Sequence, residues 1–212
     1  FKSANITYQI YQLLKQIIKK ITLFKSKKIL VILSQVPPGF TRRIVWPSNK
    51  LYYQVETLIF GEAVYRALKP ERTIIGCSNS SDKINIKLKK YLNLFKCPIF
   101  KMKYESAELA KVSINMYLIS TITTTNVLAE ISKKNNANWQ EIASALKFDK
   151  RIGKYAYLNP GLGIAGGNLE RDLKTISKIS KSKKIDSKLF ELWQNKSGYF
   201  RNWALKAFKD AS

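Results

Sequence analysis

The sequence AELAKVSIN, residues 107–115, opens the stretch that decides how the second half of this chain folds. Residues 106–133 contain no proline and no glycine, and their apolar side chains recur at helical spacing. We therefore predict one long helix over residues 106–133. Its apolar residues lie on more than one side, which indicates a helix that is buried on most sides. We expect it to pack against a twofold copy of itself in the intact protein.

The residues before this helix alternate between short apolar runs and helical patterns. Residues 29–33, 73–77 and 97–100 have the length and β-branched content of buried strands. A helix capped by Ser81 or Asp82 is expected between the second and the third of these strands. This alternation predicts the edge of an α/β sheet.

Apolar periodicity predicts further helices on both sides. An amphipathic helix is expected over residues 4–22, and residues 184–211 are again helical in pattern. Another helix is expected to begin near Asn138, with Glu141 in the position of a capping box. A further helix is expected from about Leu169.

The character of the sequence changes near Lys103. We predict an α/β domain over residues 1–103, followed by an all-α domain over residues 104–212. The second domain would carry the long helix and the start of a linker.

Composition narrows the function classes. The chain has 38 basic and 14 acidic residues, a formal net charge of +24, with lysines spread over many segments. A basic nucleic-acid-binding module would need these charges on one face, so it is the weaker reading. No histidine is present, which removes histidine triads and most zinc sites. Two cysteines without a CxxC motif predict a cytoplasmic protein, and no apolar run is long enough to cross a membrane.

Four short segments follow one another in a fixed order. They are VPPGFTR at residues 36–42, AELAKVSIN at 107–115, RIG at 151–153 and PGLGIAGG at 160–167. Together they resemble the UDP-glucose/GDP-mannose dehydrogenase family, the NAD-dependent nucleotide-sugar dehydrogenases of polysaccharide biosynthesis. The resemblance covers about residues 29–195. It implies a piece of a longer protein: the C-terminal part of a Rossmann-like NAD-binding domain, then a central helical dimerisation domain.

Two polar side chains on the long helix are the first candidates for catalysis. Lys111 and Asn115 are four residues apart, so they share one face of a helix. A lysine and an amide that converge can hold an oxygen as it gains negative charge. The resemblance implies that both contact the substrate. It also implies that Asp172 handles a proton or orients water.

Asn168 breaks the family pattern. In the family that this chain resembles, the glycine-rich stretch ends in a catalytic cysteine, and here the position holds an amide. A carboxamide is not a nucleophile of that kind, so the covalent second oxidation of the family is not expected.

The resemblance assigns further contacts residue by residue. The implied substrate contacts are Glu56, Arg151, Tyr157 and Gly163. The implied cofactor contacts are Gln35, where the family has a threonine near the nicotinamide, and Arg171, where it usually has a lysine.

The implied reaction is oxidation of the sugar C6 alcohol of a nucleotide-diphosphate sugar, such as UDP-glucose, with hydride transfer to NAD in a homodimer. With Asn168 in place of cysteine, the reaction is expected to stop at the aldehyde after one oxidation step, or to oxidise the hydrate of the aldehyde only slowly. A non-catalytic relative that keeps the fold and the dimer is the main alternative. No metal, nucleic acid or membrane is expected as a partner.

Overall fold

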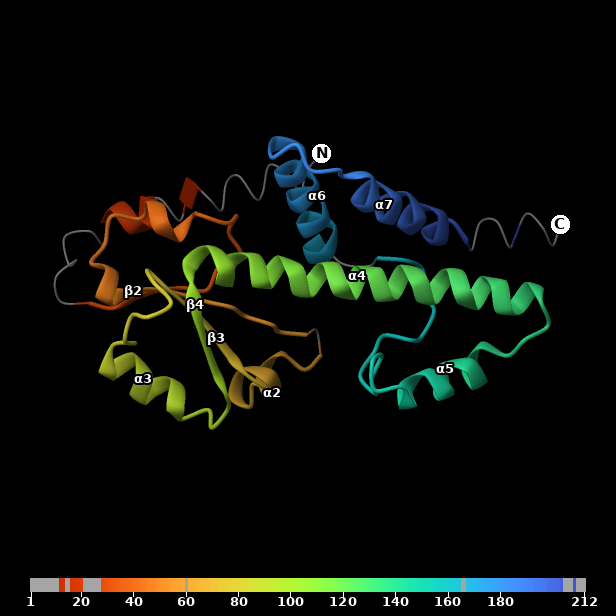
Figure 1. Ribbon diagram of the computed structural model, residues 1–212, viewed down its shortest axis with the longest axis horizontal. Helices are drawn as coiled ribbons and strands as arrows, with labels where there is room; N and C mark the ends of the chain where they lie inside the picture. The colour runs from red at the N-terminus through yellow and green to blue at the C-terminus, as the bar shows by residue number, and fades with distance from the viewer. Residues whose placement is uncertain are drawn as a thin grey trace. The chain divides into compact units, whose positions relative to one another are not determined.

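The computed structural model describes residues 12–13, 16–20, 28–59, 61–164, 167–203 and 208 (Figure 1). The chain divides into two compact units, residues 1–113 and residues 114–212. The long helix α4 (Tyr104–Lys134) gives residues to both units. Among the described residues, no helix combines the length and the apolar character that a membrane crossing would need.

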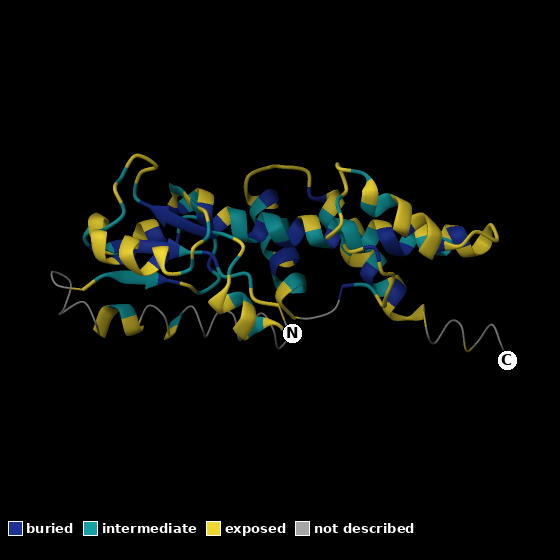
Figure 2. Ribbon diagram, turned by 90° about the horizontal axis from the view of Figure 1, so that it is seen from below, coloured by how far each residue is buried: buried dark blue, intermediate teal, exposed yellow. Residues whose placement is uncertain are grey.

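The first unit contains a four-stranded mixed sheet. Its strands are β1 (Leu30–Ile32), β2 (Leu51–Gln54), β3 (Thr73–Cys77) and β4 (Ile99–Lys103), in that order across the sheet. β1 is parallel to β2 and β3 is parallel to β4, whereas β2 and β3 run antiparallel. Every residue of β3 is buried, which explains its continuous apolar sequence. Figure 2 shows buried, dark-blue strand segments of this sheet among helices with yellow, exposed sides.

The parallel connection from β1 to β2 uses no α-helix among its described residues. It contains two 3-10 turns, η2 (Thr41–Arg43) and η3 (Ser48–Lys50). After β2 the chain forms the short helix α2 (Ala63–Leu68), and α3 (Ile86–Asn93) connects β3 to β4.

Helix α3 covers the sheet with one apolar face. Leu88 and Leu92, four residues apart, pack with Tyr52, Ile75 and Cys77 in one buried cluster. Burial raises the pKa of the Cys77 thiol to about 11, so this cysteine is a core residue rather than a reactive one.

The predicted cap of α3 is wrong. The helix begins after Asn85, whose side-chain oxygen accepts a hydrogen bond from the backbone N–H of Lys87 at 3.1 Å. Asp82 instead accepts from the backbone N–H of Asn79 at 2.8 Å and closes the turn that follows β3. Asp82 and Asn85 are both residue types that cap helices. The apolar pattern of α3 is too short to show which of the two begins the helix.

The start of α4 lies close against β3. A Cβ atom added to Gly76 would lie 3.0 Å from the Cβ of Ala107 and 3.2 Å from the Cα of Tyr104. The Tyr104 hydroxyl donates to the carbonyl of Leu51 at 2.8 Å, which ties the same helix turn to β2. The first turns of α4 are therefore fixed to the sheet.

The second unit is helical among its described residues. It contains the rest of α4, α5 (Trp139–Phe148), α6 (Gly167–Ser182) and α7 (Lys188–Arg201). Asn138 caps α5 by accepting from the N–H of Gln140 at 2.9 Å, and its own amide donates to Glu141 at 3.2 Å. The helix start predicted near Asn138 is thus confirmed.

The predicted strands at residues 29–33, 73–77 and 97–100 and the long helix are confirmed, with β4 running on to Lys103. Strand β2 and helix α2 were missed, because both are short and lack a clear period. The helix expected over residues 4–22 lies largely outside the described residues, of which 12–13 and 16–20 are helical. The tail expected over residues 184–211 is helical as α7, and most of its last part lies outside them too.

Candidate functional site

A buried amide–carboxylate pair forms the centre of the candidate site. Asn115 on α4 donates its Nδ2–H to Oδ2 of Asp172 on α6, with 2.5 Å between the two atoms. Asn115 is 6% exposed and Asp172 is 1% exposed. A carboxylate this deeply buried is stable only with hydrogen-bond partners, so the pair joins the two helices as well as two predicted site residues.

The loop before α6 is held by two adjacent polar residues of α4. The Thr125 hydroxyl donates to the backbone carbonyl of Tyr157 at 2.8 Å, and Asn126 Oδ1 accepts from the backbone N–H of Gly161 at 2.8 Å. Both side chains are buried. Each side chain gives a backbone group of the loop the hydrogen-bond partner that a helix or a sheet would otherwise supply. The glycine-rich loop is therefore positioned by α4, the helix that also carries Asn115.

Gly163 needs to be glycine for two reasons. Its φ is +88°, a left-handed value that costs a side-chain-bearing residue energy. A Cβ atom there would also lie 2.8 Å from the backbone oxygen of Ser197 on α7. The next residue, Ile164, donates its backbone N–H to the Ser197 hydroxyl at 3.0 Å. The loop thus lies directly on α7.

We expect Gly163→Ala to lower the free energy of unfolding by about 1–3 kcal/mol, through the positive φ and the contact with Ser197. Chemical denaturation of the purified protein measures this. Gly161→Ala is the matched control, since a Cβ at Gly161 meets nothing within 4 Å. Equal stability of the two variants would contradict the described packing.

Asn168 and Arg171 lie on the first turns of α6. An Nη2–H of Arg171 donates to Oδ1 of Asn168 at 2.9 Å. The amide oxygen of Asn168 therefore already accepts a hydrogen bond, and the NH₂ group is the hydrogen-bond donor of this exposed side chain. This position offers a hydrogen-bond donor where the family pattern has a thiol.

Lys111 lies on α4 one helical turn before Asn115 and is partly buried. It belongs to the first unit, whereas Asn115 and Asp172 belong to the second. The structure brings Asn115 and Asp172 together, and the convergence of Lys111 with them stays a prediction.

Gln35 and Glu56 lie in the first unit. Gln35 follows β1 and is partly buried. Glu56 follows β2 and accepts a hydrogen bond from the amide of Gln54 at 3.2 Å. Glu56 also lines a cavity of about 430 Å³ together with Arg66 and Arg72. Both arginines pair with Glu71, at 3.1 and 3.3 Å.

Arg151 and Tyr157 lie in the loop between α5 and α6. Arg151 donates to both carboxylate oxygens of Asp149, at 3.0 and 2.6 Å. The pair raises the pKa of Arg151 and lowers the pKa of Asp149. The side chain of Arg151 is 90% exposed, and that of Tyr157 is exposed too. Their predicted contact with substrate stays a prediction.

The spacing of Gly161, Gly163 and Gly166 reads G-x-G-x-x-G, the pattern of dinucleotide-binding loops. That function requires a strand directly before the first glycine. Residues 153–160 contain no strand, so the spacing here is not a dinucleotide-binding loop.

Sequence reasoning missed three residues that shape the site. Glu108, Thr125 and Asn126 are buried polar residues on α4, and each holds a loop. The signal was available: acidic and amide side chains on a helix with few solvated faces need partners inside the protein. No cluster of three or more histidine, cysteine, aspartate or glutamate side chains suited to a metal occurs in the described ranges.

Several known proteins are similar to this chain in sequence. Residues 105–197 match the model of the UDP-glucose/GDP-mannose dehydrogenase family, central domain. The chain is 32% identical over 166 residues to a UDP-glucose 6-dehydrogenase of Campylobacter jejuni, covering 77% of this chain and 42% of the relative. It is 30% identical over 173 residues to the UDP-glucose 6-dehydrogenase TuaD of Bacillus subtilis, covering 77% of this chain and 37% of the relative. The chain thus spans less than half the length of these relatives.

Solved structures have the same fold. A UDP-glucose dehydrogenase from Pyrobaculum islandicum superposes with a TM-score of 0.73 at 24% identity, over 86% of this chain and 44% of that chain. A UDP-D-ManNAc dehydrogenase from Pyrococcus horikoshii gives a TM-score of 0.76 at 19% identity, over 94% of this chain and 49% of that chain. The four-stranded sheet and the helical segment correspond to the Rossmann-like and central helical domains of such enzymes. The chain belongs to the UDP-glucose/GDP-mannose dehydrogenase family.

Proposed function

We propose that the intact protein oxidises the C6 alcohol of the sugar in a nucleotide-diphosphate sugar and that NAD accepts the hydride. The observation that carries this proposal is the buried contact between Asn115 and Asp172. It joins two polar residues whose positions match the motifs of the family to which the chain belongs. A hydrogen-bonded amide and carboxylate also occur in structural roles, so it is the match of both positions to the family motifs that favours a chemical role.

Three side chains would act on the reacting alcohol. As the C6 oxygen loses its proton and the carbon loses a hydride, negative charge develops on that oxygen. The Lys111 ammonium group would stabilise this charge, and the second Nδ2–H of Asn115 would donate to the same oxygen. Asp172 holds the first Nδ2–H of Asn115, so it fixes how the amide is turned. Asp172 is also the group that would accept the proton.

NAD supplies the hydride acceptor when it is bound. The described residues fit one side of such a site. Gln35 lies just beyond β1, in a segment whose following turn is held by the buried carboxylate of Glu108. Cofactors of open α/β sheets bind next to the carboxyl ends of the strands, which is where Gln35 lies. Gln35 would contact the cofactor there, and Arg171 is the second residue proposed to do so.

Asn168 limits the proposed reaction to one oxidation. The second oxidation of the family needs a sulfur nucleophile at this position to form an adduct with the aldehyde. The Asn168 amide can only donate a hydrogen bond to the aldehyde or to its hydrate, and its oxygen is already bound by Arg171. The product would therefore be the nucleotide-sugar aldehyde.

A second copy of the chain is the proposed protein partner. Leu109, Tyr117, Leu128 and Ile131 of α4 are all at least 40% exposed. Exposed apolar side chains along one helix favour burial against another subunit. We expect the intact protein to sediment as a dimer at micromolar concentration, and a monomer at that concentration would count against this contact.

A non-catalytic role is the second candidate. It is favoured by the replacement of the nucleophile with Asn168 and of a threonine with Gln35. Such a protein would keep the fold and the dimer, and it would not turn over a nucleotide sugar.

One assay separates the two candidates. The intact protein is incubated with NAD and, in turn, with UDP-glucose, UDP-N-acetylmannosamine and GDP-mannose, while NADH is followed by absorbance. NADH formation with one of these sugars supports the enzyme. Binding of a nucleotide sugar without any NADH would support the non-catalytic relative.

A further inference from the structure

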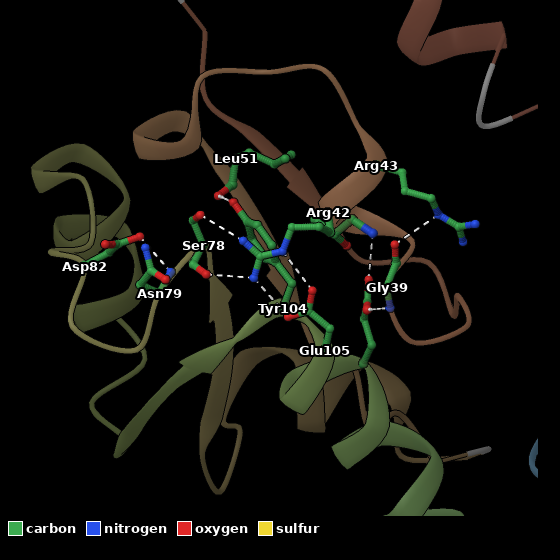
Figure 3. A network of polar contacts seen from close by, with 11 residues as sticks. Gly39, Arg42, Arg43, Leu51, Ser78, Asn79, Asp82, Tyr104 and Glu105 are labelled. Atoms are coloured by element: carbon green, nitrogen blue, oxygen red, sulfur yellow. Dashed lines mark hydrogen bonds and ion pairs between the residues drawn. The ribbon is translucent and has the colours of Figure 1, made fainter. Parts of the chain in front are cut away.

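The turn between β1 and β2 is attached to α4 by two carboxylates (Figure 3). Both belong to the first turns of the helix, Glu105 and Glu108, three residues apart and therefore on one side of it. They bind three residues of the turn, Gly39, Thr41 and Arg42. All of these residues lie in the first unit.

Glu108 makes the buried attachment. Its side chain is 0% exposed, and its two oxygens accept from the backbone N–H of Gly39 at 2.5 Å and of Thr41 at 2.7 Å. Among side chains of this size, only an ionised carboxylate can accept hydrogen bonds at both of its terminal atoms. Hydrogen bonds to a charged acceptor are about twice as strong as neutral ones. The buried charge is therefore stabilised by the turn that it holds.

The turn is built to present the N–H group of Gly39. Phe40 donates its N–H to the carbonyl of Pro37 at 3.1 Å, with Gly39 at a φ of +84°. Proline and glycine at the two central positions are the residues of a type II turn. Such a turn leaves the N–H of its glycine without a partner in the turn itself, and the Glu108 carboxylate takes it.

Arg42 makes the exposed attachment. Its guanidinium donates to both oxygens of Glu105, at 2.8 and 3.0 Å, and to the hydroxyl and carbonyl of Ser78, at 3.0 and 2.8 Å. The ring of Tyr104 lies 5.0 Å from it. Arg42 lowers the pKa of Glu105 through this hydrogen-bonded pair. Because the pair is exposed to solvent, it contributes less than the buried carboxylate does.

We propose that Glu108 is a positioning residue that holds the segment containing Gln35 in register with the turn of α4 that carries Lys111. Gln35 lies two residues before Pro37, the first residue of the turn, and Lys111 follows Glu108 by three residues on the helix. The catalytic consequence rests on the proposed function, in which Gln35 contacts the cofactor and Lys111 contacts the substrate. Glu108 contacts neither the cofactor nor the substrate in this scheme. It fixes the distance between Gln35 and Lys111, the residues that would contact them.

Glu108→Gln is the test variant, because an amide accepts at one oxygen and presents N–H groups at the other position. One of the two backbone N–H groups then loses its acceptor. We expect hydrogen exchange of the amides in residues 36–43 of the intact protein to rise about tenfold. We also expect kcat to fall about tenfold, with the KM for the nucleotide sugar unchanged, because a small displacement of reacting groups lowers the rate of the chemical step.

Glu105→Gln is the matched control. It lies on the same helix and loses a carboxylate that binds Arg42, while the N–H groups of Gly39 and Thr41 keep their acceptor. We expect unchanged exchange in residues 39–41 and a kcat within about twofold of the parent. Glu108→Asp is a second variant in case the glutamine variant does not fold. It keeps the charge and stretches both bonds, and smaller increases in exchange are expected.

Each outcome decides part of the proposal. Unchanged exchange in residues 36–43 of a folded Glu108 variant would overturn the attachment. Raised exchange with unchanged kcat, or a raised KM with unchanged kcat, would overturn the positioning role. A parent protein without turnover would overturn the proposed function instead, and the exchange comparison would still decide whether Glu108 holds the turn.

Discussion

Replacing Lys111 with methionine is expected to lower kcat of the intact protein by about 100- to 1,000-fold, the usual cost of removing one group that stabilises a developing oxyanion. Methionine keeps much of the length and apolar stem of lysine and removes the charge, so the packing of α4 changes little. The KM for the nucleotide sugar should change much less, because the lost interaction is strongest in the transition state.

Lys133→Met controls for the loss of one positive charge from α4. Lys133 is exposed near the end of the same helix and has no proposed part in the reaction. Steady-state rates of the two variants, measured side by side with their unfolding curves, make the comparison. A Lys111 variant that is folded and retains kcat within twofold would remove this lysine from the mechanism.

Replacing Asn168 with cysteine is expected to create a thiol that reacts quickly at neutral pH. The position lies on the first turn of α6, and the helix N-terminus together with the neighbouring Arg171 favours a thiolate. Of the native cysteines, Cys77 is buried with a pKa of about 11, and Cys97 is partly buried. We expect alkylation of the introduced thiol to be at least about tenfold faster than that of Cys97, as measured by peptide mass spectrometry.

Ser182→Cys is the matched control, since it places an exposed thiol at the opposite end of α6, where the helix dipole disfavours a thiolate. Equal alkylation rates for the two introduced thiols would show that the start of α6 does not activate a nucleophile. In the enzyme assay, the Asn168 variant is expected to approach two NADH per sugar, because the thiol permits the second oxidation.

Helices could be predicted from the sequence where the apolar spacing ran over many residues or where a capping residue marked the helix start. The uninterrupted apolar spacing of residues 106–133 predicted α4, and Asn138 with Glu141 predicted the start of α5. Short elements such as β2 carry too few residues for a period, and their pairing with distant strands is what stabilises them.

The candidate site was predictable only in part for a related reason. Asn115 and Asp172 were both identified, because helical spacing and motif order point to them. Their direct contact joins residues 57 positions apart in the sequence, so only the fold reveals it. Glu108 was missed because its place on a mostly apolar helix indicates only that it needs a partner inside the protein and does not say which partner. Its partners are backbone N–H groups, which leave no trace in the sequence.

The amount of NADH formed per nucleotide sugar consumed by the intact protein tests the central claim most directly. The measurement is made to completion, with and without prior treatment by a thiol-alkylating reagent. The account predicts one NADH per sugar, an aldehyde product, and no effect of alkylation, because Asn168 supplies no nucleophile. Two NADH per sugar, abolished by alkylation of Cys77 or Cys97, would contradict it.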